Sequence, residues 1–226
     1  MVFGFQTLMV LETRYNYRNM PIASMVPVAL PGQPVSAATG TKLSSFGYEF
    51  EVPWPDEDVP NVQRKVIDLF SFRSGMLVLV GHGSNHDMIE TLAKEWKLKP
   101  EDVRSSYGDS DYEFLQAALN TTPASLHLTD STQESFRKAM LLLLKTIIVP
   151  GDSGIFKVSM PQFKGFQYGN PAKHPRKIVL ALYSSHGLVE LTFSRRDGNA
   201  MQDLSQADVN RAIQTMRYVE TPSAAK

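Results

Sequence analysis

The segment Lys177–Ser194 constrains the fold more than any other stretch of the chain. Its second half alternates apolar Val189, Leu191 and Phe193 with polar residues, and this period of two places one face of a strand in a core and the other in water. Its first half, residues 178–182, is apolar without a break, which is typical of a strand inside a sheet with both faces covered. The turn between the halves ends in Gly187, which supplies the positive φ of a short connection. We therefore predict an antiparallel hairpin, with His186 as a turn residue.

Patterns of both helix and strand occur elsewhere in the chain. Residues 48–52 alternate as a half-buried strand, and residues 64–72 and 76–80 predict a second hairpin. The middle of the chain reads as helical, with Ser110 and Ser131 each followed three residues later by a glutamate, as in a capping box. Ser205 is the predicted N-cap of a last helix. The helix after Ser131 has an apolar stripe that we expect to be buried: Phe136, Met140, Leu143, Leu144 and Ile147, widened by Leu141 and Leu142.

These elements predict one α+β domain over residues 42–219, a mainly antiparallel β-sheet packed by helices, with a frayed tail at 220–226. The residues before it differ in composition. Residues 1–19 begin with an apolar run that is too short to span a membrane alone, so this segment is either the stub of an anchor or a piece that packs on the domain. Residues 20–41 are rich in proline and predict an extended linker.

Charge and cysteine content exclude several classes of function. The chain has 23 basic and 23 acidic residues, so no overall field draws it to a polyanion, and we expect no nucleic-acid partner. It has no cysteine, which removes disulfides, zinc-thiolate sites and thiol chemistry. Phosphate-binding glycine loops and the Gly-x-Ser-x-Gly elbow of hydrolases are also absent from the sequence, so we predict no cofactor and no catalytic residue.

Two histidines are the candidates for chemistry. His82 and His86 are four residues apart, the spacing at which a helix presents two imidazoles to one metal ion, and Asp87 and Glu90 would complete a ligand set. The intervening Gly-Ser-Asn lacks the catalytic glutamate of that motif and disfavours a helix. We therefore favour loop histidines at the end of a strand, without a metal, and keep a metal-assisted hydrolase as the alternative.

Four aromatic residues leave two interpretations open. Tyr48, Trp54, Phe166 and Tyr168 either edge a binding groove or belong to the core. Aromatic side chains carry a large apolar area, so the core is favoured. The ligand-binding residues are not identified by the sequence.

Several segments resemble a known family. Gly47–Trp54, Phe72–Gly75, Ser153–Phe156 and Lys164–Gln167, with the hairpin and the last helix, resemble a family of uncharacterised bacterial proteins over about Thr41–Tyr218. That resemblance implies an N-terminal membrane anchor and no known activity. More distantly, a strand ending in Phe-x-Val-Pro with a tryptophan, a hairpin and a closing helix is similar to the Mog1/PsbP-like fold, an α/β/α sandwich, which implies an accessory or binding role without catalytic residues.

Together these features favour a non-catalytic accessory or binding module over an enzyme. The apolar start and the proline-rich segment favour tethering on the outer side of a bacterial cytoplasmic membrane, with an unidentified protein or small molecule as partner. A hydrolase using His82 and His86 and a cytoplasmic partner-binding protein are the alternatives.

Overall fold

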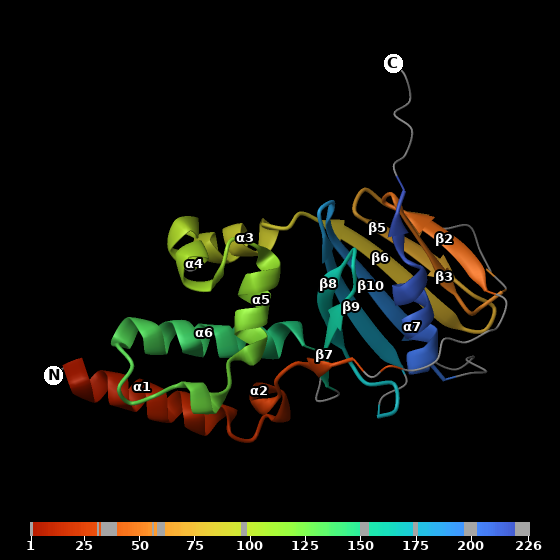
Figure 1. Ribbon diagram of the computed structural model, residues 1–226. Helices are drawn as coiled ribbons and strands as arrows, with labels where there is room; N and C mark the ends of the chain where they lie inside the picture. The colour runs from red at the N-terminus through yellow and green to blue at the C-terminus, as the bar shows by residue number, and fades with distance from the viewer. Residues whose placement is uncertain are drawn as a thin grey trace, which may run out of the picture. The chain divides into compact units, whose positions relative to one another are not determined.

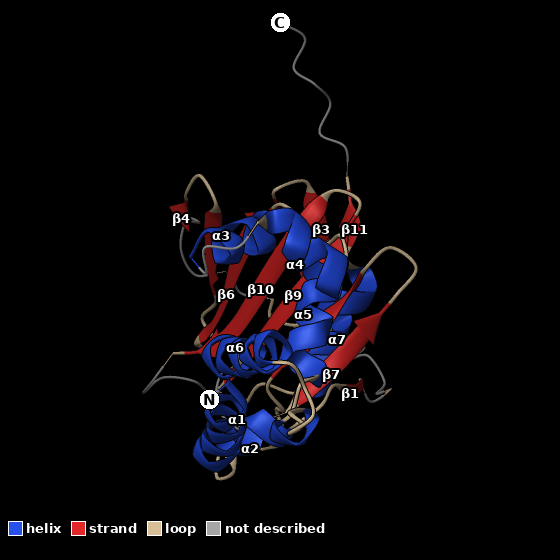
Figure 2. Cartoon of the chain, turned by 90° about the vertical axis from the view of Figure 1, so that its left-hand side faces the viewer, coloured by secondary structure: helices blue, strands red, loops and turns tan. Residues whose placement is uncertain are grey.

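The computed structural model describes residues 2–30, 32, 40–55, 57, 62–95, 99–149, 154–173, 176–196 and 203–219. The chain forms two compact units: unit 1 comprises Met1–Ala29 and Asn85–Lys157, and unit 2 comprises Leu30–Ser84 and Val158–Lys226. Helices dominate unit 1 and antiparallel strands dominate unit 2 (Figures 1 and 2). The predicted α+β class with a mainly antiparallel sheet is confirmed.

The large sheet of unit 2 is antiparallel throughout and has the strand order β8-β9-β10-β6-β5-β4. The strands are β4 (Val62–Gln63), β5 (Ile67–Ser71), β6 (Met76–Gly83), β8 (Lys164–Tyr168), β9 (Lys177–Ser184) and β10 (Gly187–Arg195). The hairpin predicted around Gly187 is β9–β10, and Gly187 has φ +115°. Strand β9 lies between β8 and β10, so the interior position predicted from its apolar run is confirmed.

A second layer packs on one face of this sheet (Figure 1). It consists of a three-stranded sheet and one helix. The strands are, in order, β11 (Arg217–Tyr218), β3 (Tyr48–Val52) and β2 (Thr41–Ser45), and the helix is α7 (Gln206–Thr215). Apolar side chains of both layers form one core, from Tyr48 and Phe50 of β3 to Leu180 of β9, Leu191 of β10 and Ile213 of α7. The predicted caps are present, because Ser205 and Asp208 form a reciprocal capping box at the start of α7.

Unit 1 is built from helices. Its elements are α1 (Val2–Tyr17), α2 (Pro21–Ser24), β1 (Val28–Ala29), α3 (Asp87–Glu95), α4 (Pro100–Tyr107), α5 (Asp111–Asn120), the 3-10 helix η1 (Pro123–Ser125) and α6 (Thr132–Ile148). Strand β7 (Ile155–Ser159) pairs in parallel with β1 and carries the chain into unit 2. Ser110 and Glu113 form the predicted capping box of α5, and the Ser131 hydroxyl accepts a hydrogen bond from the Glu134 backbone at the start of α6.

The buried face of α6 differs from the predicted one. Leu141, Leu142 and Leu144 are buried, whereas Phe136, Leu143 and Ile147 are 47%, 40% and 70% exposed. Leu142 packs against Val10 of α1, and Leu141 and Leu144 pack with residues of α3 and α5. Because apolar residues cover more than half of the helix circumference, their spacing alone does not select the face that packs.

Lys145 is a buried lysine of unit 1. Its side chain is fully buried, and its ammonium donates hydrogen bonds to the backbone oxygens of Ala23, Met25 and Thr121, at 3.2 Å for Ala23 and 2.9 Å for Thr121. Burial lowers the pKa of Lys145 to about 8. This ammonium therefore joins α2 and the end of α5 to α6.

The N-terminal residues form part of unit 1. Val10 of α1 is fully buried and packs with Ala23, Leu126 and Leu142. The segment predicted as an extended linker begins with α2, which tolerates Pro21 because the first helical position needs no N–H donor. Among the described residues, no helix combines the length and the apolar composition needed to cross a membrane.

Candidate functional site

Five aromatic and imidazole rings lie in succession at one end of unit 2. We call them the aromatic row: His186, Tyr218, Tyr48, His82 and Phe46. The imidazole of His186 stacks on the ring of Tyr218 with centroids 3.7 Å apart and planes 6° apart, and Tyr218 meets Tyr48 edge-on at 5.3 Å. Tyr48 lies 6.3 Å from His82, which in turn stacks on Phe46 at 5.8 Å. Tyr48 is fully buried, whereas both histidines and Tyr218 are exposed.

Phe46 occupies a strained position in this row. The hairpin β2–β3 has a two-residue loop, because Ser45 pairs with Tyr48 and leaves Phe46 and Gly47 as the connection. Both have positive φ, 50° for Phe46 and 79° for Gly47, as in the turn type that normally carries Asn-Gly. A phenylalanine in this region costs roughly 1–3 kcal/mol and points to a role for its side chain.

Tyr218, near the C-terminus of the chain, packs against this turn. A Cβ added to Gly47 would lie 3.0 Å from the Tyr218 ring, so the glycine is needed for this contact as well as for its φ. The backbone N–H of Val219 donates a hydrogen bond to the Gly47 oxygen at 2.7 Å. The strained turn is thus fixed by residues that lie far away in the sequence.

His82 lies close to Gly187, the residue that follows His186 in the β9–β10 turn. His82 is at the end of β6, and its backbone N–H donates to the Val66 oxygen at 3.3 Å. A Cβ on Gly187 would lie 3.3 Å from Nε2 of His82 and 2.6 Å from the Gly83 oxygen, so only glycine lets the hairpin end pack here. The Ser184 hydroxyl lies 3.0 Å from the Tyr48 hydroxyl and accepts a hydrogen bond from the His186 backbone. Burial is the main cause that raises the pKa of Tyr48.

A buried carboxylate lies next to the row. Asp68 is 5% exposed, and its Oδ2 accepts a hydrogen bond from the hydroxyl of Ser45, the residue before Phe46, at 2.6 Å. Asp68 pairs with Val80 in the ladder, two residues before His82, so Asp68 and His82 share the core-facing side of β5 and β6. Within the described part of the chain, no ion pair to Asp68 is formed.

The sequence-predicted residues are not brought together as one set. His82 is in strand β6 of unit 2, whereas His86, Asp87 and Glu90 are at or near the start of α3 in unit 1. His82 thus lies inside a strand, one residue before its end, and not in a loop. No group of three or more His, Cys, Asp or Glu side chains that could hold a metal ion occurs among the described residues.

The start of α3 is instead capped by a carboxylate from α5. Asp111 is 1% exposed, and its two oxygens accept hydrogen bonds from the backbone of Met88 at 2.8 Å and of Ile89 at 2.9 Å. Burial raises the pKa of Asp111 although these two hydrogen bonds oppose it. This contact satisfies N–H groups at the helix terminus and is structural.

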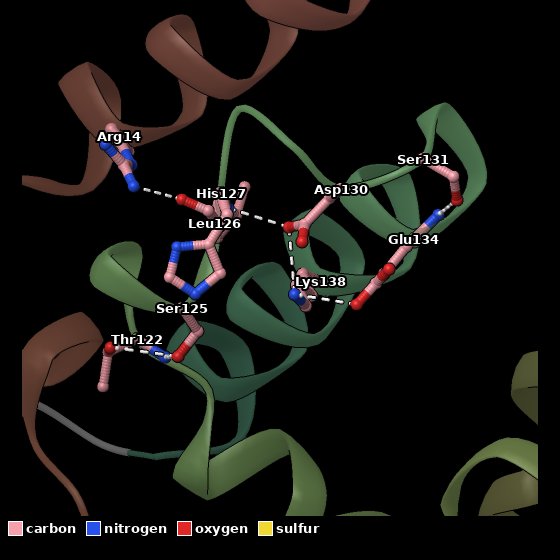
Figure 3. Close-up of polar contacts among 9 residues, drawn as sticks. All are labelled: Arg14, Thr122, Ser125, Leu126, His127, Asp130, Ser131, Glu134 and Lys138. Atoms are coloured by element: carbon pink, nitrogen blue, oxygen red, sulfur yellow. Dashed lines mark hydrogen bonds and ion pairs between the residues drawn. The ribbon is translucent and has the colours of Figure 1, made fainter.

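The connection between α5 and α6 carries a second polar cluster, drawn in Figure 3. Asp130 accepts hydrogen bonds from the His127 backbone at 2.8 Å and from the Lys138 ammonium at 2.9 Å, and Lys138 also pairs with Glu134 at 2.9 Å. Burial alone would raise the pKa of Asp130, but these contacts outweigh it and the pKa is lowered. Arg14 of α1 donates a hydrogen bond to the Leu126 oxygen of this connection. The partners of Asp130 lie within the connection or on α6, so these contacts stabilise the start of α6.

The aromatic residues predicted as groove or core belong to the core. Tyr48, Trp54, Phe166 and Tyr168 are at most 4% exposed. Tyr48 also belongs to the aromatic row, together with Phe46, His186 and Tyr218, which the sequence did not single out as ligand-binding. The one local signal was the Phe46–Gly47 pair in a turn position that favours Asn-Gly.

No protein-family model, no curated protein and no solved structure matches this chain. The arrangement of the aromatic row itself indicates its chemistry. Exposed ring faces bind other rings, C–H groups and cations. The candidate functional site is therefore the aromatic row, which includes exposed rings of this kind.

Proposed function

We propose that this protein is a non-catalytic binding module and that the aromatic row of unit 2 is its ligand site. Three features support the proposal. Exposed ring faces are assembled from four separate segments of the chain, they are fixed by Gly47 and Gly187, and a buried carboxylate lies beside them. A surface that was only structural would not need so many rings turned toward solvent.

The observation that carries the proposal is the conformation of Phe46. An asparagine or glycine would form the same turn without strain, yet a large apolar side chain is held there, half-buried and stacked on His82. Backbone strain of this kind is typical of ligand-binding positions.

Phe46→Asn is expected to separate binding from stability. Relief of the strained φ offsets the lost contacts of the half-buried ring, so the free energy of unfolding should stay within about 1 kcal/mol of the wild type. Binding should be lost, because the ring at the end of the row is removed. Ligand-observed NMR with a mixture of organic cations, organic anions, sugars and short peptides measures the binding, and urea denaturation measures the stability.

Leu128→Asn is the matched control, because Leu128 is an exposed apolar residue of unit 1 and is 51% exposed. It should bind like the wild type. If no compound class binds the wild type, or if the bound compounds are unaffected by Phe46→Asn, the proposed ligand site is wrong.

We also propose that the module is tethered on the outer side of a bacterial cytoplasmic membrane through its N-terminal segment. Helix α1 carries apolar residues on the side away from its buried Val10: Leu8 is 61% exposed, Leu11 49% and Tyr15 61%. Arg18 lies over the Tyr15 ring at 3.9 Å. Exposed apolar residues opposite the buried face of a helix favour a second apolar environment, and an aromatic-arginine pair is suited to a membrane interface.

The native protein should therefore remain in the membrane fraction of its own host after a carbonate wash, which strips peripheral proteins. An antibody to unit 2 detects it. A clean soluble signal would contradict the tether and would make the cytoplasmic alternative the better one, while leaving the ligand site untouched.

A further inference from the structure

The aromatic row has the composition of a site for an organic cation. Ring faces attract cations through their quadrupole, most strongly where a carboxylate nearby adds a full negative charge. Phe46 and Tyr218 supply the aromatic rings, and Asp68 supplies the charge. We propose that the aromatic row together with Asp68 binds an organic ammonium ion, and this inference rests on the proposed binding role.

Asp68 is a buried acidic residue next to the aromatic row. Its carboxylate is 5% exposed and takes its short hydrogen bond from a neutral hydroxyl, that of Ser45. Burial of a carboxylate without a positive partner is costly, and a bound cation would repay that cost. Ser45 is adjacent to Phe46 and pairs with Tyr48 in the ladder, so this charge lies directly beside the row.

The charged residues of the small sheet do not repel a cation that is bound at the aromatic row. Lys42 and Arg217 both pair with Glu49, at 2.7 Å and 2.8 Å. Lys42 and Glu49 alternate with the inward-facing Leu43 and Tyr48, so this cluster points to the other face of the small sheet. Asp68 is therefore the charge that faces the row from within the core.

The stacked pair at the other end shows that the Tyr218 ring accepts a flat ring on its face. His186 is in the β9–β10 turn, and its imidazole lies parallel to the Tyr218 ring at 3.7 Å. Tyr218 is 37% exposed and Phe46 is half-buried, so both rings remain accessible. An ammonium ion bound at the row would contact the accessible parts of these two rings.

Choline and 3,3-dimethylbutan-1-ol are a matched pair of probes, since they differ by the replacement of a charged nitrogen with a neutral carbon. In a backbone NMR titration of the full chain, choline is expected to shift the amides of residues 46, 47, 186 and 218 in a saturable way. The neutral alcohol should bind roughly tenfold more weakly or not at all. This comparison uses the wild-type protein and does not depend on any variant folding.

Asp68→Asn tests the source of the charge, because asparagine can still accept the Ser45 hydrogen bond. It is expected to weaken choline binding roughly tenfold and to leave the neutral alcohol unchanged. Tyr218→Leu should weaken choline binding by a similar factor. Lys65→Gln, an exposed residue of the β4–β5 turn, is the control and should not weaken it.

Equal binding of choline and the neutral alcohol overturns the inference, as does choline binding that survives Asp68→Asn. Absence of any saturable shift at roughly 100 mM choline, where even a Kd of several millimolar gives near saturation, overturns it as well. In each case the proposed binding role stands if another compound class binds in a Phe46-dependent way. Both proposals are wrong only if no compound class binds in a Phe46-dependent way.

Discussion

Lys145→Met is expected to lower the free energy of unfolding by about 3 kcal/mol. The ammonium of Lys145 donates to three backbone oxygens, those of Ala23, Met25 and Thr121. Methionine has a similar length but no donor, so the substitution leaves three carbonyls near α2 and the end of α5 without this partner. Each such loss costs roughly 1 kcal/mol or more when the group is buried. Urea denaturation followed by far-UV circular dichroism measures the effect on the helical unit.

Lys138→Met provides the matched control on the same helix. Lys138 pairs with Asp130 and Glu134 near the surface, and Glu134 is 54% exposed. This variant should lose about 1 kcal/mol or less, because salt bridges that reach solvent contribute little. Equal losses in the two variants would contradict the role assigned to burial at Lys145.

The same lysine predicts a direction for the pH dependence of stability. Burial lowers the pKa of Lys145 from its ordinary value of 10.5 to about 8 in the folded chain. Between these values the unfolded chain binds more protons than the folded one, so the free energy of unfolding should rise with pH across this window. The rise in the free energy of unfolding should be larger in the wild type than in Lys145→Met. An identical pH profile in both proteins would mean that Lys145 is exposed to water in the folded chain.

Trp54→Ala is expected to have the largest effect in unit 2, a loss of about 4 kcal/mol. Trp54 is 2% exposed, and its ring lies 5.4 Å from that of Phe72 and 6.3 Å from that of Phe193. Alanine would leave a cavity where both layers of the unit meet. Its backbone oxygen would still accept the hydrogen bond from the Thr41 hydroxyl at 2.6 Å, so the loss reports the side chain.

Urea denaturation of Trp54→Ala and of Trp54→Phe measures this loss. The phenylalanine variant keeps much of the ring volume and should lose clearly less. A loss of under about 1 kcal/mol in the alanine variant would mean that Trp54 is not a core residue but belongs to a groove that was closed in the structure.

Local patterns determined much of the fold. The β9–β10 hairpin, the capping boxes at Ser110 and Ser205 and the interior position of β9 follow from period, turn residues and caps that lie within a few residues of each other. The core position of Trp54 also follows, because a large apolar ring gains most from burial. Such features need no knowledge of distant partners.

Other features were decided by tertiary structure. The sequence marks Lys145 as a polar break in an apolar helix, but carbonyls from α2 and the end of α5 make its burial possible. Leu141 rather than Phe136 packs because the neighbouring helices lie on that side of α6. In both cases the local sequence allowed two outcomes, and distant contacts chose one.

The aromatic row shows most clearly which features depend on the local sequence and which depend on the tertiary structure. The sequence by itself determined that Phe46–Gly47 lies next to a strand, that His82 follows an apolar run and that His186 is in a turn. Only the packing of the small sheet on the large one brings these rings and Tyr218 within stacking distance, with Asp68 behind them. The physical reason is the separation along the sequence of the residues that interact. Helix caps and strand periodicity depend on residues that are near neighbours in the sequence. A ring stack forms between distant residues that only the completed core brings together.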